Sequence, residues 1–347
     1  MKVFFSDIQS RHDPKCFLVN GAQQANPEVP GRADALLTAA RAAGHEITAP
    51  DDHGLAPMAT VHTPAYLEFL STIHRRWQHI EGASEEVIPN IHPIDRNGRY
   101  PSSAVAHAGY HMADTACPIS ADSWDSIYWS ANSAVSAADS VAATGRTAYA
   151  LCRPPGHHAF KDLAGGFCFV NNSAVAAHRL RRVFERVAIV DVDLHHGNGT
   201  QGIFYDRSDV FTLSIHADPD RFYPFFWGHA DERGAGAGLS YNLNLPIPRG
   251  SGDDLFLSVL EKGLKHIEWF APGAVVVALG LDAFQGDPFG GLAVTTPGFE
   301  QTAELVGRYC RAHGAVSLLV QEGGYLCPEL GDNLVSFLKG FETGLAP

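Results

Sequence analysis

The chain has 347 residues, 45% of them hydrophobic and 10% aromatic, which excludes disorder and suits one large α/β domain or two smaller ones. Its 38 acidic and 25 basic residues give a formal net charge of −13 with histidine neutral. That charge repels phosphate backbones and anionic lipid, so we expect no nucleic-acid or membrane partner and favour neutral or cationic ones.

The sequence also predicts a cytoplasmic protein. Segment 1–7 has only a brief apolar run before an acid, unlike a secretory signal peptide, and no stretch reaches the roughly 18–20 apolar residues of a membrane span. The six cysteines are widely spaced and form no CxxC pair, which is typical of reduced cytoplasmic thiols and excludes a zinc-finger pattern.

Apolar runs alternate with amphipathic stretches along the chain. The runs are rich in Val, Ile and Leu and predict strands buried on both faces, at 3–6, 147–152, 187–193, 210–216, 274–281 and 315–321. Helical periodicity predicts helices at 33–43, 63–77, 124–144, 172–184, 253–270, 296–313 and 330–341. This alternation predicts a mostly parallel multi-stranded sheet with helices on both faces and a ligand site beyond the carboxyl ends of the strands.

One segment, 78–123, fits neither pattern. It is rich in Pro, Asn and Asp and has no clean period. Because no second core is visible beside it, we interpret residues 1–347 as a single domain and 78–123 as a loop insertion with a functional or interaction role.

Polar residues that end apolar strands carry the chemistry. Asp191, Asp193 and His195 alternate, so their side chains share one face as the strand runs out. Two carboxylates and an imidazole crowded together favour a metal such as Zn²⁺ or Fe²⁺, with an ion-pair or capping cluster as the alternative.

Asp282 ends a second apolar strand at the same predicted edge of the sheet. It completes a set of three ligands with Asp193 and His195, which leaves a position open for water and so indicates a catalytic metal site. A helix N-cap is the alternative interpretation of Asp282.

Two further strand ends add groups suited to acid–base work. His157 and His158 stand on a Pro-Pro-Gly turn and are candidates for a general base, with Asp191 and Asn198 as groups that orient the two imidazoles. Phe167, beside two glycines, is a candidate aromatic wall.

Tyr325 follows tandem glycines and is a candidate neutral donor to an oxyanion. The alternative for Tyr325 is a structural role, with the ring packed and the hydroxyl exposed to solvent. For Phe169, a place in the aromatic wall and packing in the core are equally good interpretations.

Together these clusters closely resemble the histone deacetylase family of the arginase-like superfamily, and in particular its acetylpolyamine amidohydrolase branch. The resemblance covers nearly the whole chain and depends on four ordered motifs: RPPGHH (153–158), GGFCFVNN (165–172), DVDLHHGNGTQ (191–201) and EGGY (322–325). It implies a single arginase/deacetylase-like domain that hydrolyses amides with a metal.

The resemblance also implies the roles of individual residues. Zn²⁺ is expected on Asp193, His195 and Asp282, with Fe²⁺ as a possible replacement. His157 and His158 are expected to activate water and protonate the leaving amine, and Tyr325 to polarise the scissile carbonyl.

Further positions follow from the same resemblance. Phe167 and Tyr223 are expected to line an acyl-chain tunnel, and the Gly166 carbonyl to accept from the substrate amide. A structural potassium ion is expected at five residues: Asp191, Asp193, His195, Ser214 and Ile215.

The expected reaction is removal of acetyl groups from small cationic N-acetylated amines, either acetylpolyamines or short acetylated diamines, to give acetate and the free amine. In this branch the insertion builds a dimer interface that narrows the entrance, so a homodimer through 78–123 is expected. The acidic residues that recognise polyamines in the branch are not clearly matched here, with only Asp114 nearby.

Three alternatives stay open. They are a lysine deacetylase acting on acetyl-lysine in proteins or peptides, a ureohydrolase of the same superfold, and a metal-stabilised module that binds acyl amines without hydrolysing them.

Overall fold

In the computed structural model, which describes residues 1–347, eight parallel strands form one sheet. The strands are β1 (Lys2–Phe4), β4 (Glu46–Thr48), β5 (Ala148–Ala150), β6 (Val187–Asp191), β7 (Val210–Ala217), β8 (Asn242–Ile247), β9 (Ala274–Leu279) and β10 (Val316–Gln321). Their order across the sheet is β4-β1-β5-β10-β9-β6-β7-β8, and a separate hairpin pairs β2 (Cys16–Val19) with β3 (Ala22–Ala25).

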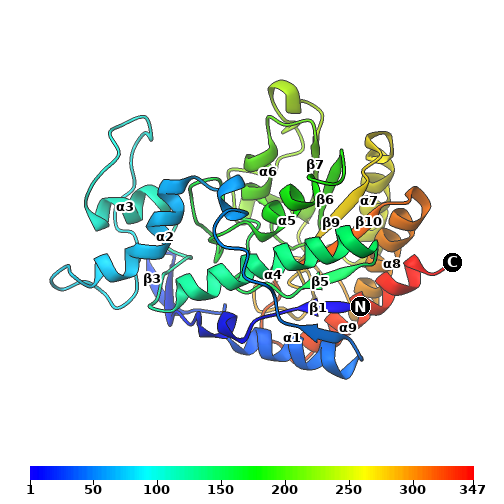
Figure 1. Cartoon of the computed structure of the whole chain (residues 1–347), viewed down its shortest axis with the longest axis horizontal. Coiled ribbons are helices and arrows are strands. Elements are labelled where there is room, and N and C mark those ends of the chain that lie inside the picture. The colour runs from blue at the N-terminus through cyan, green and yellow to red at the C-terminus, as the bar shows by residue number, and fades with distance from the viewer.

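Helices cover both faces of this sheet (Figure 1). They are α1 (Gly31–Ala42), α2 (Pro64–Trp77), α3 (Ala104–His111), α4 (Ser123–Thr144), α5 (Asn172–Leu180), α6 (Asn198–Phe204), α7 (Asp253–His266), α8 (Thr296–His313) and α9 (Leu330–Leu345). Buried residues of α1, α7, α8 and α9 form one apolar core, and those of α2 to α6 form a second on the opposite face. The predicted fold class is therefore confirmed.

Strand β9 shows why such strands read as continuous apolar runs. Val275, Val277 and Leu279 belong to one core, whereas the alternating residues Val276 and Ala278 belong to the other. Because successive side chains point to opposite faces and both faces are covered, β9 carries buried apolar side chains at every position.

All six predicted strands and seven predicted helices are present, with shifted ends. The edge strands β4 and β8, the hairpin and the helices α3 and α6 were not predicted. The segment 78–123 is consequently not loop alone, since it contains α3, and Val87, Ala108 and Ile119 within it are buried in the second core, with residues of α2 to α6.

Figure 1 places α2, α3 and the long loops before α3 at one end of the molecule, opposite the end that carries α8. No helix of the structure is both long enough and apolar enough to cross a membrane. All six cysteines are unpaired.

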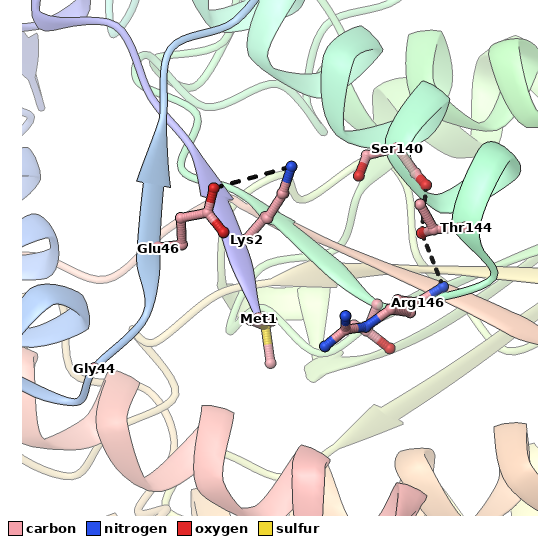
Figure 2. A pocket seen from close by; sticks show the side chains of 8 residues that line it. Met1, Lys2, Gly44, Glu46, Ser140, Thr144 and Arg146 are labelled. Carbon is pink, nitrogen blue, oxygen red and sulfur yellow. Dashed lines mark hydrogen bonds and ion pairs between the residues drawn. The ribbon is translucent and has the colours of Figure 1, made fainter.

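A pocket opens at the amino ends of β1, β4 and β5 (Figure 2). Lys2 lies 3.9 Å from Glu46 in it, and Thr144 and Arg146 line its other side. Glu46 is the only acidic residue of the lining, which has no histidine or cysteine, so the pocket offers no set of metal ligands. It also lies at the edge of the sheet opposite to that where ligands bind in parallel sheets.

A buried neutral histidine gives the fold an expected acid sensitivity. The Asn171 N–H, at the start of α5, donates to His62 Nε2 (3.0 Å), and burial lowers the pKa of His62 from 6.5 to about 4. The unfolded chain therefore binds this proton at a higher pH than the folded chain. The stability that neutral His62 contributes is complete above about pH 6.5 and is lost as the pH falls toward 4, with a slope of up to about 1.4 kcal/mol per pH unit.

Denaturant unfolding of metal-free protein across this pH window measures the effect. We expect the free energy of unfolding to depend less steeply on pH in His62→Gln, by the equivalent of about one proton. His79→Gln, at an exposed histidine, is the control and should leave the slope unchanged. Equal slopes in wild type and His62→Gln would contradict the assignment.

Candidate active site

The carboxyl ends of β6 and β9, which are neighbours in the sheet, bring three predicted metal ligands together. Asp193 and His195 follow β6, Asp282 follows β9, and all three side chains are buried. His195 Nδ1 lies 3.1 Å from Asp282 Oδ2 and 3.3 Å from Asp193 Oδ1. One ligand atom from each of the three lies within 4.8 Å of the others, so they can reach a shared centre.

The surroundings of these three residues fit a cation. Burial and the neighbouring Asp193 carboxylate raise the pKa of Asp282, because two buried carboxylates repel each other. A Cβ at Gly323 would lie 2.3 Å from Asp282 Oδ2 and 2.6 Å from Asp193 Oδ2, so only glycine leaves room beside both oxygens. Two carboxylates and an imidazole are a donor set that suits Zn²⁺ or Fe²⁺.

Backbone groups fix the two carboxylates in place. The Gly323 N–H donates to Asp193 Oδ2 (2.8 Å) and the Leu194 N–H donates to Asp282 Oδ1 (3.0 Å). No helix begins at Asp282, so the helix N-cap interpretation of this residue is wrong.

The tandem histidines lie against this cluster, each with its own partner. His157 Nδ1 donates to Asp191 Oδ2 (3.0 Å) and His158 Nδ1 donates to Asn198 Oδ1 (2.6 Å). The two rings are 4.1 Å apart, and His157 Nε2 lies 3.8 Å from Asp193 Oδ1.

These partners separate the protonation states of the two imidazoles. Burial lowers the pKa of His157, but Asp193 and Asp191 outweigh it, and the pKa rises to about 10. Burial, together with the charges of His157 and His195, lowers the pKa of His158 well below its ordinary value. His158 is therefore neutral. Because its Nδ1–H makes the bond to Asn198, the lone pair on Nε2 is free to accept a proton.

Sequence reasoning missed the residue that holds the histidine turn. Glu322 is fully buried at the end of β10 and accepts from the Gly156 N–H (2.6 Å), the His157 N–H (2.9 Å) and the Ser173 hydroxyl (2.6 Å). His157, Glu322 and Cys168 also have ligand atoms close together. Because both Glu322 oxygens already accept bonds from the chain, we interpret Glu322 as an anchor and not as a ligand. The available signal was its position directly after an apolar strand, the same signal that identified Asp282.

Tyr325 and the predicted wall residues lie around the cluster. The Tyr325 ring packs 5.8 Å from Phe167, and its N–H donates to Asp287 Oδ2 (2.9 Å). Tyr223 lies edge-on to His158 at 4.9 Å, and a Cβ at Gly166 would meet both of them within 3 Å. Phe169, by contrast, is fully buried in the second core, with residues of α2 to α6, as its packing interpretation predicts.

The residues of the expected potassium site are also neighbours. Asp191 and Ser214 are paired in register on β6 and β7, with Ile215 next to Ser214. Asp193 and His195 follow on the same turn after β6. The Ser214 hydroxyl contacts His216 Nδ1 at 2.9 Å.

Comparison with known proteins identifies the family of the chain. A family model described as "Histone deacetylase domain" matches residues 26–341. The chain is 45% identical to an acetylpolyamine amidohydrolase of Burkholderia pseudomallei over 98% of both chains. It is 41% identical to that of Mycoplana ramosa over 98% of this chain and 99% of that protein.

A solved structure extends the likeness to three dimensions. The crystal structure of acetylpolyamine aminohydrolase from Burkholderia pseudomallei superposes with a TM-score of 0.94 at 45% identity and covers 98% of each chain. The chain therefore belongs to the histone deacetylase family and, within it, to the acetylpolyamine amidohydrolase branch.

Proposed function

We propose that this metal-dependent deacetylase removes acetyl groups from small cationic N-acetylated amines, acetylpolyamines or short acetylated diamines, using Zn²⁺ or, as a replacement, Fe²⁺. The observation that carries the proposal is the buried set Asp193, His195 and Asp282 beside the paired imidazoles His157 and His158. The names of the similar amidohydrolases support the substrate class.

In the proposed reaction a bound Zn²⁺ or Fe²⁺ supplies Lewis acidity that polarises the acetyl carbonyl and acidifies the attacking water. His158 accepts the proton of that water at Nε2, because its Nδ1–H is committed to Asn198. Asp191 holds His157 in place by accepting a hydrogen bond from its Nδ1–H.

Tyr325 completes the mechanism. Its hydroxyl donates to the acetyl oxygen as negative charge develops there, while the Asp287 carboxylate holds its backbone. His158 then returns the proton to the departing amine, which leaves acetate and free amine as products. Phe167 and Tyr223 line the path of the carbon chain, and the Gly166 carbonyl accepts from the substrate amide.

The charge of the chain favours a cationic substrate. A formal net charge of −13 raises the local concentration of a cationic amine. The alternative function is that of a lysine deacetylase acting on proteins or peptides, which needs a wide entrance to the active site.

We further propose a single domain of residues 1–347 that forms a homodimer through segment 78–123. Exposed apolar side chains at that end of the molecule, Ile91, Ile94 and Tyr100, support an interface there. A structural potassium ion on Asp191, Asp193, His195, Ser214 and Ile215 is part of the same proposal. Size-exclusion chromatography with light scattering tests the dimer, and a monomer at micromolar concentration would contradict it.

Acetate release tests the function directly. Purified enzyme is incubated with N-acetylputrescine, N-acetylcadaverine, acetylated polyamines and an acetyl-lysine peptide. We expect acetate from the small amines, loss of activity after chelation, and recovery when Zn²⁺ or Fe²⁺ is added back. Release from the peptide alone would favour the lysine deacetylase, and tight binding of acyl amines without acetate would favour the binding module.

A further inference from the structure

The end of segment 78–123 forms part of the frame of the proposed substrate tunnel. The backbone of 111–116 runs beside the loop that carries Gly166 and Phe167. The Ala164 N–H donates to the His111 carbonyl (2.8 Å), and the Ala113 N–H donates back to the Ala164 carbonyl (2.7 Å). The Phe167 N–H donates to the carbonyl of Ala116 (3.2 Å), so the two segments are bonded along their length.

Asp114 stands at the centre of this contact. Its Oδ2 accepts from the Tyr223 hydroxyl (2.7 Å) and the Gly166 N–H (3.1 Å), and its Oδ1 accepts from the Ala116 N–H (2.8 Å). Three donors therefore converge on two oxygens. Only a carboxylate accepts from all of them, because an asparagine would turn its NH₂ group toward at least one donor. Bonds to a charged acceptor are also the stronger ones.

The loop that Asp114 holds needs such support. Gly166 has φ of +51° and Phe167 has φ of +66°, a left-handed conformation that a bulky residue adopts only where its surroundings enforce it. The N–H and C=O of a trans peptide point in opposite directions. The bond from the Phe167 N–H to Ala116 therefore turns the Gly166 carbonyl away from segment 111–116.

We propose that Asp114 is a positioning residue for substrate selectivity. By accepting hydrogen bonds from both Tyr223 and Gly166, it holds the Tyr223 side of the tunnel against the loop that carries Gly166 and Phe167 on the other side. This inference rests on the proposed function, in which Gly166, Phe167 and Tyr223 contact the substrate. It assigns to segment 78–123 a part in the tunnel itself, besides the proposed part in dimer formation. Loss of the carboxylate widens the tunnel without removing any reacting group.

Steady-state kinetics of Asp114→Asn test the proposal with two substrates, the linear N-acetylputrescine and an N-acetylated amine with a branched carbon chain. We expect KM for the linear substrate to rise about tenfold with kcat within about threefold of wild type, because Asp114 touches no reacting atom. The preference in kcat/KM for the linear over the branched substrate should fall. Asp125→Asn removes the same charge from an exposed site on the first turn of α4 and should leave both quantities unchanged.

Tyr223→Phe separates positioning from folding, because it keeps the ring and removes only the hydroxyl. We expect a smaller rise in KM than in Asp114→Asn, since Gly166 keeps its bond to Asp114. The rise in the double variant should be smaller than the product of the two single effects. A merely structural role would lower the active fraction at unchanged KM.

The outcomes are distinguishable. No acetate from the wild-type enzyme with any acetylated amine would overturn the proposed function, and this inference with it. An active wild type with unchanged KM and unchanged selectivity in Asp114→Asn would overturn the role of Asp114 alone. If Asp114→Asn does not fold, Tyr223→Phe decides by the same two quantities.

Discussion

Tyr325→Phe is expected to lower kcat by about 10²–10³-fold, equivalent to about 3–4 kcal/mol of transition-state stabilisation. The hydroxyl donates to the acetyl oxygen, on which negative charge grows only as the amide is attacked. Its loss therefore affects the transition state more than the bound substrate. The buried ring keeps its contacts with Phe167 and Phe289, so the site keeps its shape.

Three measurements separate this result from a folding defect. Metal content and the affinity for a substrate-like amine should stay at wild-type values in Tyr325→Phe, while acetate release falls. Tyr309→Phe is the control, because the Tyr309 hydroxyl on α8 is buried without a hydrogen-bond partner and its removal should leave kcat unchanged. A near-normal kcat in Tyr325→Phe would contradict the oxyanion role.

The buried centre of the fold could be predicted from sequence because it depends on local pattern. Strands such as β6 and β9 are covered on both faces, and their apolar runs end in Asp191 and near Asp282. The edge strand β8 could not be predicted in this way. It is paired on one side only and alternates asparagine with leucine, and it contains Pro246.

The anchoring groups of the site were harder to predict because they act over long sequence separations. Glu322 bonds the turn at Gly156 and His157, and Asp114 bonds Tyr223. No local pattern connects residues so far apart in the chain, whereas the alternation of Asp191, Asp193 and His195 is itself local. A pattern within one strand end therefore predicts the residues that form the centre. The position of Glu322 after a strand marks it as a candidate, but only the folded chain shows which groups Glu322 and Asp114 hold.

Asp282→Asn is expected to remove activity by removing the metal. The substitution keeps the shape of the side chain, and its amide oxygen can still accept from the Leu194 N–H. It removes one of two negative charges from the ligand set, so we expect metal affinity to fall by more than about 10²-fold, the upper range for groups that only orient ligands. Acetate release at stoichiometric Zn²⁺ should be lost accordingly.

Metal should therefore stabilise the wild-type fold but not the fold of Asp282→Asn. A metal at about 100 times its Kd stabilises the wild-type fold by about 2.7 kcal/mol, and the same concentration should leave Asp282→Asn nearly unaffected. Without metal, the variant should be at least as stable as wild type, because Asp193 no longer faces a second buried carboxylate. Asp254→Asn, at an exposed position in the first turn of α7, is the control for loss of one acidic charge. Thermal unfolding with chelator and with Zn²⁺ measures all of these, and an Asp282→Asn protein that Zn²⁺ stabilises as much as wild type would contradict the ligand role.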